Sequence, residues 1–229
     1  MQLLVITPPT TTAVETRVAG AMLEAGLTAL HLRKPGAPAQ ELAAYIEAIP
    51  EEFHSRLVLH SHYGLVPRYG LRGAHLPAGR RAAGPPPWQP GSGFTLSTSF
   101  HSLAEVARHR HRYDYVFLSP IFDSLSKPGY GAAFDPGALQ RALAGWAARP
   151  SYRPQVLALG GIAANNLDTI RVMGFAGAAV LGAVWQSPNP MATFQALQLS
   201  CWQSAPTVGG LSGDEKQSTL GSPAKTRIS

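Results

Sequence analysis

The stretch Asp114–Lys127, DYVFLSPIFDSLSK, joins a short apolar run to a polar loop. The run Tyr115–Leu118 lacks the polar alternation of a half-exposed strand, which is typical of a strand buried on both faces. The loop that follows carries serines, an aspartate and a lysine among turn-forming residues. A buried strand, a polar loop and then a helix make up the repeating unit of parallel α/β folds. The fold class therefore depends on how often this unit recurs.

The same unit recurs eight times along the chain, with short helices or an irregular loop in some of the connections. Strands are predicted at Leu3–Thr7, Ala29–Arg33, Leu57–His60, Gly73–Leu76, Thr95–Ser99, Tyr115–Leu118, Val156–Leu159 and Gly177–Leu181. Helical spacing of apolar residues predicts helices between most of them, and Pro77–Gly93 is predicted to be an irregular loop. Eight such units in about two hundred residues predict one closed (β/α)₈ TIM barrel. The alternative is a doubly wound open sheet, but no G-x-G-x-x-G follows the first strand.

The composition fits one globular domain. The chain has 229 residues, of which 45% are hydrophobic and 14% charged, a balance that supports a sizeable core. We assign residues 1–203 to the barrel. Residues 204–229 are rich in Gly, Ser, Thr, Lys and Pro and are predicted to be a disordered tail.

The net charge of +6 permits an anionic partner. Lys and Arg are scattered, with no basic helix face and no basic–aromatic interleaving, so a small anion is favoured over nucleic acid. Cys201 is the only cysteine, which excludes an internal disulfide. No apolar stretch approaches the ~20 residues of a membrane span, and the N-terminus leads directly into a predicted strand. We therefore expect a cytoplasmic protein without a membrane partner; a homo-oligomer stays open.

Active sites of such barrels lie at the C-terminal ends of the strands, where the connecting loops meet. Most of the histidines, several hydroxyls and a few cations fall there, whereas Asp123 is the only carboxylate that does. The polar residues predicted at this end include Arg33, His31, His60, His62, His75, Ser99 and His101. One of His60 and His62 is expected to serve the site, whereas His54, His109 and His111 are expected to be solvated. This end fits an anion and lacks the carboxylates that hold Mg²⁺.

Glycines follow the last two predicted strands. Gly160 and Gly161 come after the seventh strand and Gly182 after the eighth. Backbone N–H groups in these two loops often bind phosphate in barrels, so we expect these glycines to contact a phosphate. Lys127 stands among turn residues at the rim and does not belong to the solvated face of a predicted helix, so it is also expected to be functional.

Motifs in barrel order resemble the thiamine phosphate synthase family, which includes the TenI-like thiazole tautomerases. The matching segments are LLVIT near the start, HLRK (His31–Lys34), GAHL (Gly73–Leu76), STSFHSLAEV (Ser97–Val106), DYVFLSPIFDSLSK (Asp114–Lys127), LGGI (Leu159–Ile162) and GFAGAAVLGAVW (Gly174–Trp185). The resemblance covers about Met1–Trp202. It implies a (β/α)₈ barrel that binds a thiazole phosphate and, in the synthases, hydroxymethylpyrimidine diphosphate with Mg²⁺.

By position, the resemblance implies that Arg33, Ser99 and Lys127 lie on the diphosphate side. It further implies that Ser124 and Ser126 supply hydroxyls from the loop after the sixth strand.

The chain departs from the family pattern at several positions. Lys34 and Pro35 stand where the family usually has an acid and a lysine. His60 and Ser61 replace an Asn-Asp pair, and Arg80 replaces a second aspartate. Both family magnesium ligands are therefore missing, so we expect no tightly bound cofactor, although Mg²⁺ stays possible.

These departures leave the reaction open. A tautomerase needs a phosphate anchor and an acid–base group such as histidine, and His60, His62 and His101 are the candidates. The histidine that TenI-like proteins carry in the sixth loop falls on Pro120, as in the synthases. We narrowly prefer a TenI-like tautomerase or an altered synthase. The alternatives are a thiamine phosphate synthase and a non-catalytic binding protein for thiazole or thiamine phosphate.

Overall fold

Eight parallel strands form a closed barrel in sequence order, and β8 returns to pair with β1. The computed structural model describes residues 1–84, 86, 88, 93–123, 134–152 and 154–202. The predicted TIM barrel is therefore confirmed, and the doubly wound open sheet is wrong. The strands are β1 (Gln2–Ile6), β2 (Ala29–Leu32), β3 (Leu57–Leu59), β4 (Gly73–Leu76), β5 (Thr95–Phe100), β6 (Tyr115–Leu118), β7 (Gln155–Leu159) and β8 (Gly177–Val180).

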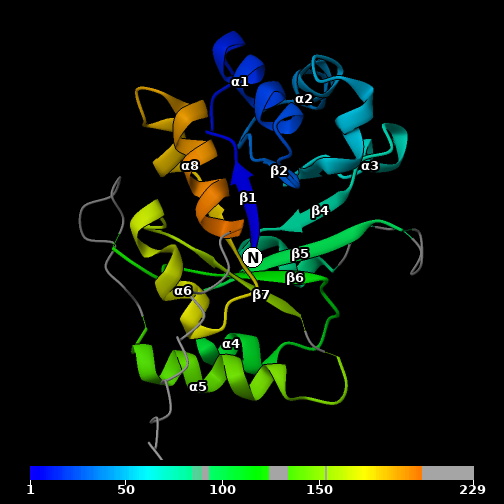
Figure 1. The fold of residues 1–229 in the computed structure, drawn as a ribbon. Coiled ribbons are helices and arrows are strands. Elements are labelled where there is room, and N and C mark those ends of the chain that lie inside the picture. Colours follow the sequence, from blue (N-terminus) through cyan, green and yellow to red (C-terminus); the bar gives the residue numbers. More distant parts are fainter. Residues whose placement is uncertain (85, 87, 89–92, 124–133, 153, 203–229) are drawn as a thin grey trace, which may run out of the picture.

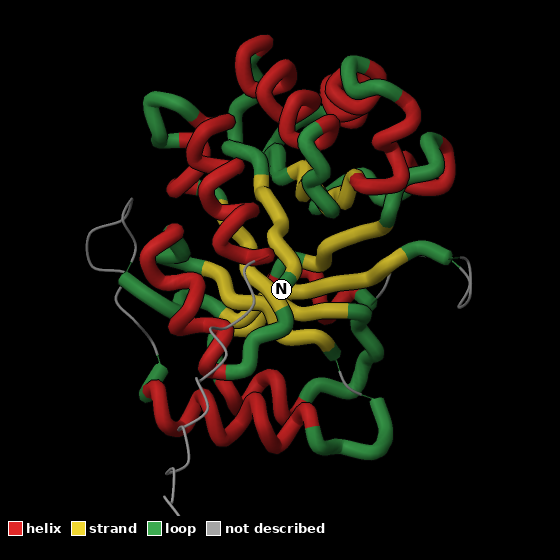
Figure 2. Tube along the Cα trace, viewed as in Figure 1, coloured by secondary structure: helices red, strands yellow, loops and turns green. Residues whose placement is uncertain are grey.

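Helices surround the strands in the ribbon and in the Cα trace (Figures 1 and 2). The α-helices are α1 (Ala13–Glu24), α2 (Ala39–Glu47), α3 (Leu65–Arg68), α4 (Leu103–Arg108), α5 (Pro136–Ala147), α6 (Leu167–Met173), α7 (Gly182–Trp185) and α8 (Pro190–Trp202). Three 3₁₀ helices, η1 (Glu51–Arg56), η2 (Ala78–Ala83) and η3 (Ala164–Asn166), complete the described helices. The stretch predicted as an irregular loop thus begins with η2.

Local capping explains where several helices begin. Thr12 caps α1 and Ser102 caps α4, each by accepting a hydrogen bond from a backbone N–H three residues on. Asp135 caps α5 in the same way, ahead of a proline in the first turn. Side-chain oxygens satisfy N–H groups that a helix start leaves unpaired. These caps help to fix where α1, α4 and α5 begin after their preceding segments.

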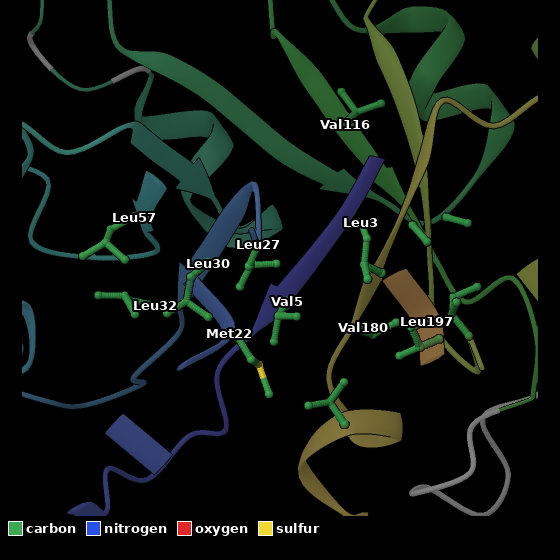
Figure 3. Packing of buried hydrophobic residues seen from close by; sticks show 14 of the residues in the cluster. Leu3, Val5, Met22, Leu27, Leu30, Leu32, Leu57, Val116, Val180 and Leu197 are labelled. Carbon is green, nitrogen blue, oxygen red and sulfur yellow. The ribbon is translucent and has the colours of Figure 1, made fainter. Parts of the chain in front are cut away.

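The apolar core has two layers. An outer cluster fills the space between the strands and the helices, and includes Leu3, Val5 and Leu30 of the barrel with Met22 of α1 and Leu197 of α8. Figure 3 shows these side chains packed around β1 and β2. A smaller cluster fills the barrel interior; it contains Leu4, Ile6, Ala29, Val58, Tyr115, Phe117, Leu157 and Ala179.

Polar side chains replace apolar ones in part of the barrel interior. Side chains two positions apart on a strand point to the same face, so His31 follows the interior residue Ala29 on β2. His75, Ser97 and Tyr115 are register partners across β4, β5 and β6. All four residues are buried. The barrel thus carries a buried polar layer that extends toward its C-terminal mouth.

Within the described part of the chain, no helix is long and apolar enough to cross a membrane. The tail predicted at 204–229 lies outside the described residues, so its disorder stays a prediction.

Candidate active site

A cavity of about 850 Å³ opens where the strands end. Its apolar lining includes Ile6, Phe117 and Leu159. Its polar lining contains cations, imidazoles and hydroxyls, and among the described lining residues there is no Asp or Glu. These polar residues are Arg33, Lys34, His60, Ser61, His62, His75, Arg80, Ser99, His101 and Ser119.

Among the described residues of this cavity, two arginines supply the available positive charge. Arg33 follows β2 and Arg80 lies in η2, and both side chains are exposed. Lys34 differs, because its ammonium is buried and donates to the Glu15 carboxylate (2.8 Å) and to two backbone carbonyl oxygens. Because its hydrogen bonds go to these three oxygens, the Lys34 ammonium holds the surrounding chain together and is not available to a ligand. Arg33 and Arg80 are therefore the better candidates for binding an anion.

Arg81, next to Arg80, is also committed to a structural contact. Its guanidinium pairs with Glu105 at 2.7 Å and lies over the Phe100 ring. Arg80 is thus the more available of the two arginines in η2.

Two of the predicted acid–base histidines have tautomers that their partners define. The Nδ1 of His101 lies 3.0 Å from the carbonyl oxygen of Ser119, and the Nε2 of His62 lies 2.8 Å from that of Ala37. A carbonyl oxygen can only accept, so each of these nitrogens carries the proton when the ring is neutral. The bare nitrogens are then Nε2 of His101 and Nδ1 of His62. Both rings line the cavity, and either could accept a proton from a ligand.

The predicted third strand ended at His60, but neither His60 nor His62 lies on a strand. β3 ends at Leu59, before both histidines, and His62 has a left-handed φ of 50°. His60 is half-buried and His62 exposed. They reach the same cavity from a turn, with different surroundings.

His60 belongs to a group of three histidines inside the barrel mouth. Its Nε2 lies 3.0 Å from Nδ1 of His31, and the Nε2 of His31 lies 2.8 Å from the Tyr115 hydroxyl. The His75 ring stacks on that of His60, with centroids 4.3 Å apart. The two nitrogens of His75 lie 2.9 Å from the hydroxyls of Ser97 and Ser99.

These three histidines are uncharged at neutral pH. Burial lowers the pKa of His31 and of His60 well below the ordinary value for histidine. Burial, together with the positive charge of Arg33, lowers the pKa of His75 to about 3. A buried imidazolium next to other cations would be costly. The cavity therefore receives its positive charge from arginines and not from this group.

The glycines after β7 have a packing role. Gly160 and Gly161 have φ values of 95° and 64°. A Cβ on Gly160 would lie 2.9 Å from Pro120 Cα, and one on Gly161 would collide with the Asp123 carbonyl oxygen. The residues after β6 hydrogen-bond to this loop, through Ile121 N–H to Leu159 O and Phe122 N–H to Gly160 O. Close contact between two loops thus accounts for these glycines, and their contact with phosphate stays a prediction.

Several predicted residues are placed differently or are not described. Gly182 starts the short helix α7 and is not among the described residues that line the cavity. Ser124, Ser126 and Lys127 lie outside the described residues, so their roles stay predictions.

His54 was expected to be solvated, and this is wrong. The ring is buried, and its Nε2 lies 3.0 Å from the carbonyl oxygens of both Ile46 and Ile49. It thus ties η1 to the end of α2. His109 is partly buried and His111 exposed.

The sequence reasoning placed Ser97 at this end of the barrel, but it took Tyr115 as part of an apolar run and gave no role to Tyr63. The structure pairs Tyr115 with Ser97 in register. No local pattern marks Tyr63, whose hydroxyl contacts the carbonyl oxygens of His60 and His75. It thereby holds together the two chain segments that present the stacked histidines.

Comparison with known proteins identifies the family. The family model described as thiamine monophosphate synthase matches residues 3–184. The chain belongs to the thiamine monophosphate synthase family. This confirms the resemblance that the motifs suggested.

Curated relatives carry the same name. A thiamine-phosphate synthase of Parasynechococcus marenigrum is 31% identical over 210 residues, which are 90% of this chain and 57% of that protein. The chain thus spans little more than half the length of this relative. A thiamine-phosphate synthase of Bordetella bronchiseptica is 32% identical over 75% of this chain and 81% of its own.

Solved structures agree on the fold. Thiamine phosphate pyrophosphorylase from Bacteroides thetaiotaomicron has a TM-score of 0.72 and 34% identity, covering 88% of this chain and 98% of that chain. The protein of the same name from Pyrococcus furiosus has a TM-score of 0.66 at 19% identity, covering 87% of this chain and 94% of that chain. Because its identity is only 19%, the Pyrococcus furiosus structure supports the fold alone.

Proposed function

We propose that the protein is a thiamine phosphate synthase, which joins hydroxymethylpyrimidine diphosphate to thiazole phosphate. The observation that carries the proposal is the family match over residues 3–184, together with relatives of that name that align over most of this chain. The comparisons thus favour the synthase over the tautomerase that the sequence narrowly preferred. The cationic cavity at the barrel mouth supports a ligand with phosphate groups.

In this reaction the thiazole nitrogen attacks the methylene carbon of the pyrimidine, and the bond from that carbon to the diphosphate oxygen breaks. The electron pair leaves with the diphosphate, so negative charge grows on the leaving group. Arg33 and Arg80 line the cavity without a described carboxylate to neutralise them. We assign to them the stabilisation of this charge, since preorganised cations lower the energy of such transition states.

The described lining does not fit a tightly bound Mg²⁺. This ion prefers carboxylate and other oxygen ligands, and the described lining offers imidazoles, guanidiniums and neutral oxygens. Ser61 and Arg80 stand at the positions where the resemblance implies aspartates. We therefore propose that the protein holds no Mg²⁺ by itself.

The test is a coupling assay with both substrates, with Mg²⁺ and with chelator, in which thiamine phosphate is measured by mass spectrometry. We expect product, and an Arg33→Ala variant should lose most of its kcat/KM. An exposed arginine outside the cavity, Arg17 on α1, gives the control Arg17→Ala. Absence of product under both conditions, in a folded protein, would refute the synthase.

A second candidate, the thiazole tautomerase, is favoured by one observation: the His60 ring, which is hydrogen-bonded to the buried His31, lines the cavity. Assay of the thiazole phosphate tautomer alone separates the two reactions. Binding of thiazole phosphate without turnover in either assay would favour the non-catalytic binding protein.

A further inference from the structure

The His60 ring is the outer member of a row of three hydrogen-bonded side chains that runs into the barrel interior. Nε2 of His60 lies 3.0 Å from Nδ1 of His31, and Nε2 of His31 lies 2.8 Å from the Tyr115 hydroxyl. His31 and Tyr115 are buried, whereas His60 is half-buried and lines the cavity. The row therefore connects a buried phenol on β6 with a ring that a ligand can reach.

The buried phenol sets the direction of these hydrogen bonds. A phenol carries one proton, and among the described residues His31 is the hydrogen-bond partner of the Tyr115 hydroxyl. The neighbouring Ser97 hydroxyl makes its hydrogen bonds with the Ala74 carbonyl oxygen and with Nδ1 of His75. If Tyr115 accepted a hydrogen bond from His31, its own proton would be buried without an acceptor, which costs free energy. The phenol therefore donates to Nε2 of His31.

This direction passes from ring to ring, because a neutral imidazole has one protonated and one bare nitrogen. Since Nε2 of His31 is bare, Nδ1 carries the proton and donates it to Nε2 of His60. Nε2 of His60 is then the bare nitrogen, and Nδ1 of His60 carries the proton. Burial lowers the pKa of both rings well below the ordinary value for histidine, and His75, Arg33 and Arg72 act in the same direction. Neither ring therefore takes up a second proton at neutral pH.

Nδ1 of His60 is open to the cavity. It makes no hydrogen bond in the described part of the chain, where the buried side-chain nitrogens without a partner are those of Arg72 and Trp88. Nδ1 of His60 is not one of these, so it has accessible surface, and Arg33 lines the same cavity. We propose that Tyr115 and His31 are positioning residues that hold His60 as a neutral N–H donor to a phosphate or diphosphate oxygen bound by Arg33. The inference rests on the proposed function only for the identity of this ligand.

Packing keeps the His31 ring in one orientation. Its centroid lies 5.1 Å from that of the Phe117 ring and 5.8 Å from that of Tyr115, and its plane stands at 79° to that of His60. Turning the ring over would exchange its nitrogen and carbon atoms and break both hydrogen bonds inside the barrel. His31 therefore transmits the direction set by Tyr115 to His60.

This assignment separates the roles of the histidines that line the cavity. His62 and His101 each donate one ring proton to a carbonyl oxygen, which leaves a bare nitrogen that can accept a proton. His60 instead presents an N–H at Nδ1 and cannot accept a proton there. A neutral donor adds a directional hydrogen bond to the positive charge that Arg33 supplies. The site thus favours a ligand that places an oxygen acceptor at His60.

A transition-metal site is the competing explanation for these histidines. One nitrogen from each of His31, His60 and His75 lies within 4.8 Å of the others, and imidazole is a ligand for Zn²⁺ and other transition metals. The ring geometry opposes a shared ion, because the rings of His60 and His75 are stacked with 26° between their planes. Lone pairs that lie in stacked, nearly parallel planes do not meet at one ion.

The first test is nitrogen-15 NMR of the histidine rings in the full chain, between pH 5 and 8. We expect a protonated Nδ1 and a bare Nε2 in both His31 and His60, with a scalar coupling across the hydrogen bond between the two rings. Tyr115→Phe keeps the ring and removes the donor, so nothing then prescribes which nitrogen of His31 is bare, and both histidines should become mixtures of tautomers. Tyr45→Phe removes another buried phenol, which donates to Glu15, and should leave the tautomers unchanged.

The second test adds inorganic diphosphate, which needs no turnover. Binding should shift the Nδ1–H resonance of His60. His60→Leu removes the donor and should weaken diphosphate binding in calorimetry by about 10- to 100-fold, the usual size for a hydrogen bond to a charged group. His60→Asn keeps an N–H donor at this position and should recover most of the affinity that His60→Leu loses. An amide would not replace a histidine that acts as a base.

The outcomes that would overturn the proposal are distinct. A proton on Nε2 of His60 with a bare Nδ1 would make His60 a base. Titration of either ring near the ordinary pKa of histidine, tautomers that do not change in Tyr115→Phe, or a His60 resonance that diphosphate leaves unshifted would also refute it. Stoichiometric binding of added Zn²⁺, with loss of the free imidazole signals, would replace it with a metal site. Failure of the coupling assay alone would refute the synthase, and the NMR of the free protein would still decide how Tyr115 and His31 act on His60.

Discussion

The buried ion pair of Lys34 with Glu15 gives the most direct test of how this site is supported. The Lys34 and Glu15 side chains are 1% and 5% exposed, and their charged atoms lie 2.8 Å apart. Lys34 also donates to the carbonyl oxygens of Pro8 and Thr10, and Glu15 accepts a hydrogen bond from Tyr45. Lys34→Met keeps the length of the side chain and removes its charge. It leaves the Glu15 carboxylate buried without a cation.

Breaking one side of a buried pair costs about 3–5 kcal/mol. For a chain of this size, each kcal/mol lowers Tm by roughly 2–4 °C, so Lys34→Met should lower Tm by about 6–20 °C. The free energy of unfolding is measured by urea titration at pH 7, and Tm by calorimetry. Arg17→Met, which removes an exposed cation from the same region, should change the stability by less than about 0.5 kcal/mol.

A triple variant separates the cost of a buried unpaired charge from the cost of lost packing. Lys34→Met, Glu15→Leu and Tyr45→Phe together remove all three polar groups, so no carboxylate is left unpaired, and the variant should recover much of the stability that Lys34→Met loses. If Lys34→Met alone stays within about 1 kcal/mol of the natural protein, the pair does not stabilise the fold. Lys34 would then count among the cations available to a ligand.

Further predictions concern pH, the glycine loop and the cavity. His75 has a pKa of about 3 in the folded protein and about 6.5 in the unfolded chain. Because the unfolded state binds more protons between these values, the free energy of unfolding should fall by up to about 1.4 kcal/mol per pH unit as pH drops below 6.5. Urea titrations at several pH values should show this slope, and a smaller one in His75→Gln. Gly161→Ala should lower the free energy of unfolding by roughly 1–3 kcal/mol, because Gly161 has a left-handed φ and a Cβ there would collide with its neighbours. Gly20→Ala in α1, where a Cβ meets nothing within 4 Å, should raise it by about 0.4–1 kcal/mol. Urea unfolding measures both changes. Lys127→Ala should weaken binding of thiazole phosphate by calorimetry, and an unchanged affinity would remove Lys127 from the site.

The barrel could be predicted from the sequence because buried strands and amphipathic helices can be recognised from the pattern of neighbouring residues. Tyr115–Leu118 and Gly73–Leu76 match the observed strands residue by residue, and most other boundaries move by one or two residues. The barrel rule then placed Arg33, His60, Ser99 and His101 at one end, where the structure brings them around one cavity. No contact between distant residues was needed for either step.

The errors arise where a residue's role depends on a distant partner. Lys34 stands among the cations of the mouth in sequence, but Glu15 on α1 neutralises it. His54 looked exposed because nothing local shows that two carbonyl oxygens of the preceding helix and turn surround its ring. For Gly161 the contact with phosphate stays a prediction, but the close approach of the backbone after β6 gives this glycine a packing role that the sequence did not show. Each assignment needed a tertiary contact that spacing along the chain does not contain.

The positive charge of the cavity follows from the residues that stand where the family pattern has carboxylates. Two of the three expected carboxylate positions carry Ser61 and Arg80, and the third carries Lys34, whose charge Glu15 already balances. His60, in place of an asparagine, is neutral because desolvation of its ring and the neighbouring His75, His31 and Arg33 lower its pKa. The described lining therefore combines arginine charge with the neutral imidazoles of His60 and His75, and it attracts anions without attracting cations. In such a site the arginines account for ligand charge, which leaves the histidines free for hydrogen bonding and proton transfer.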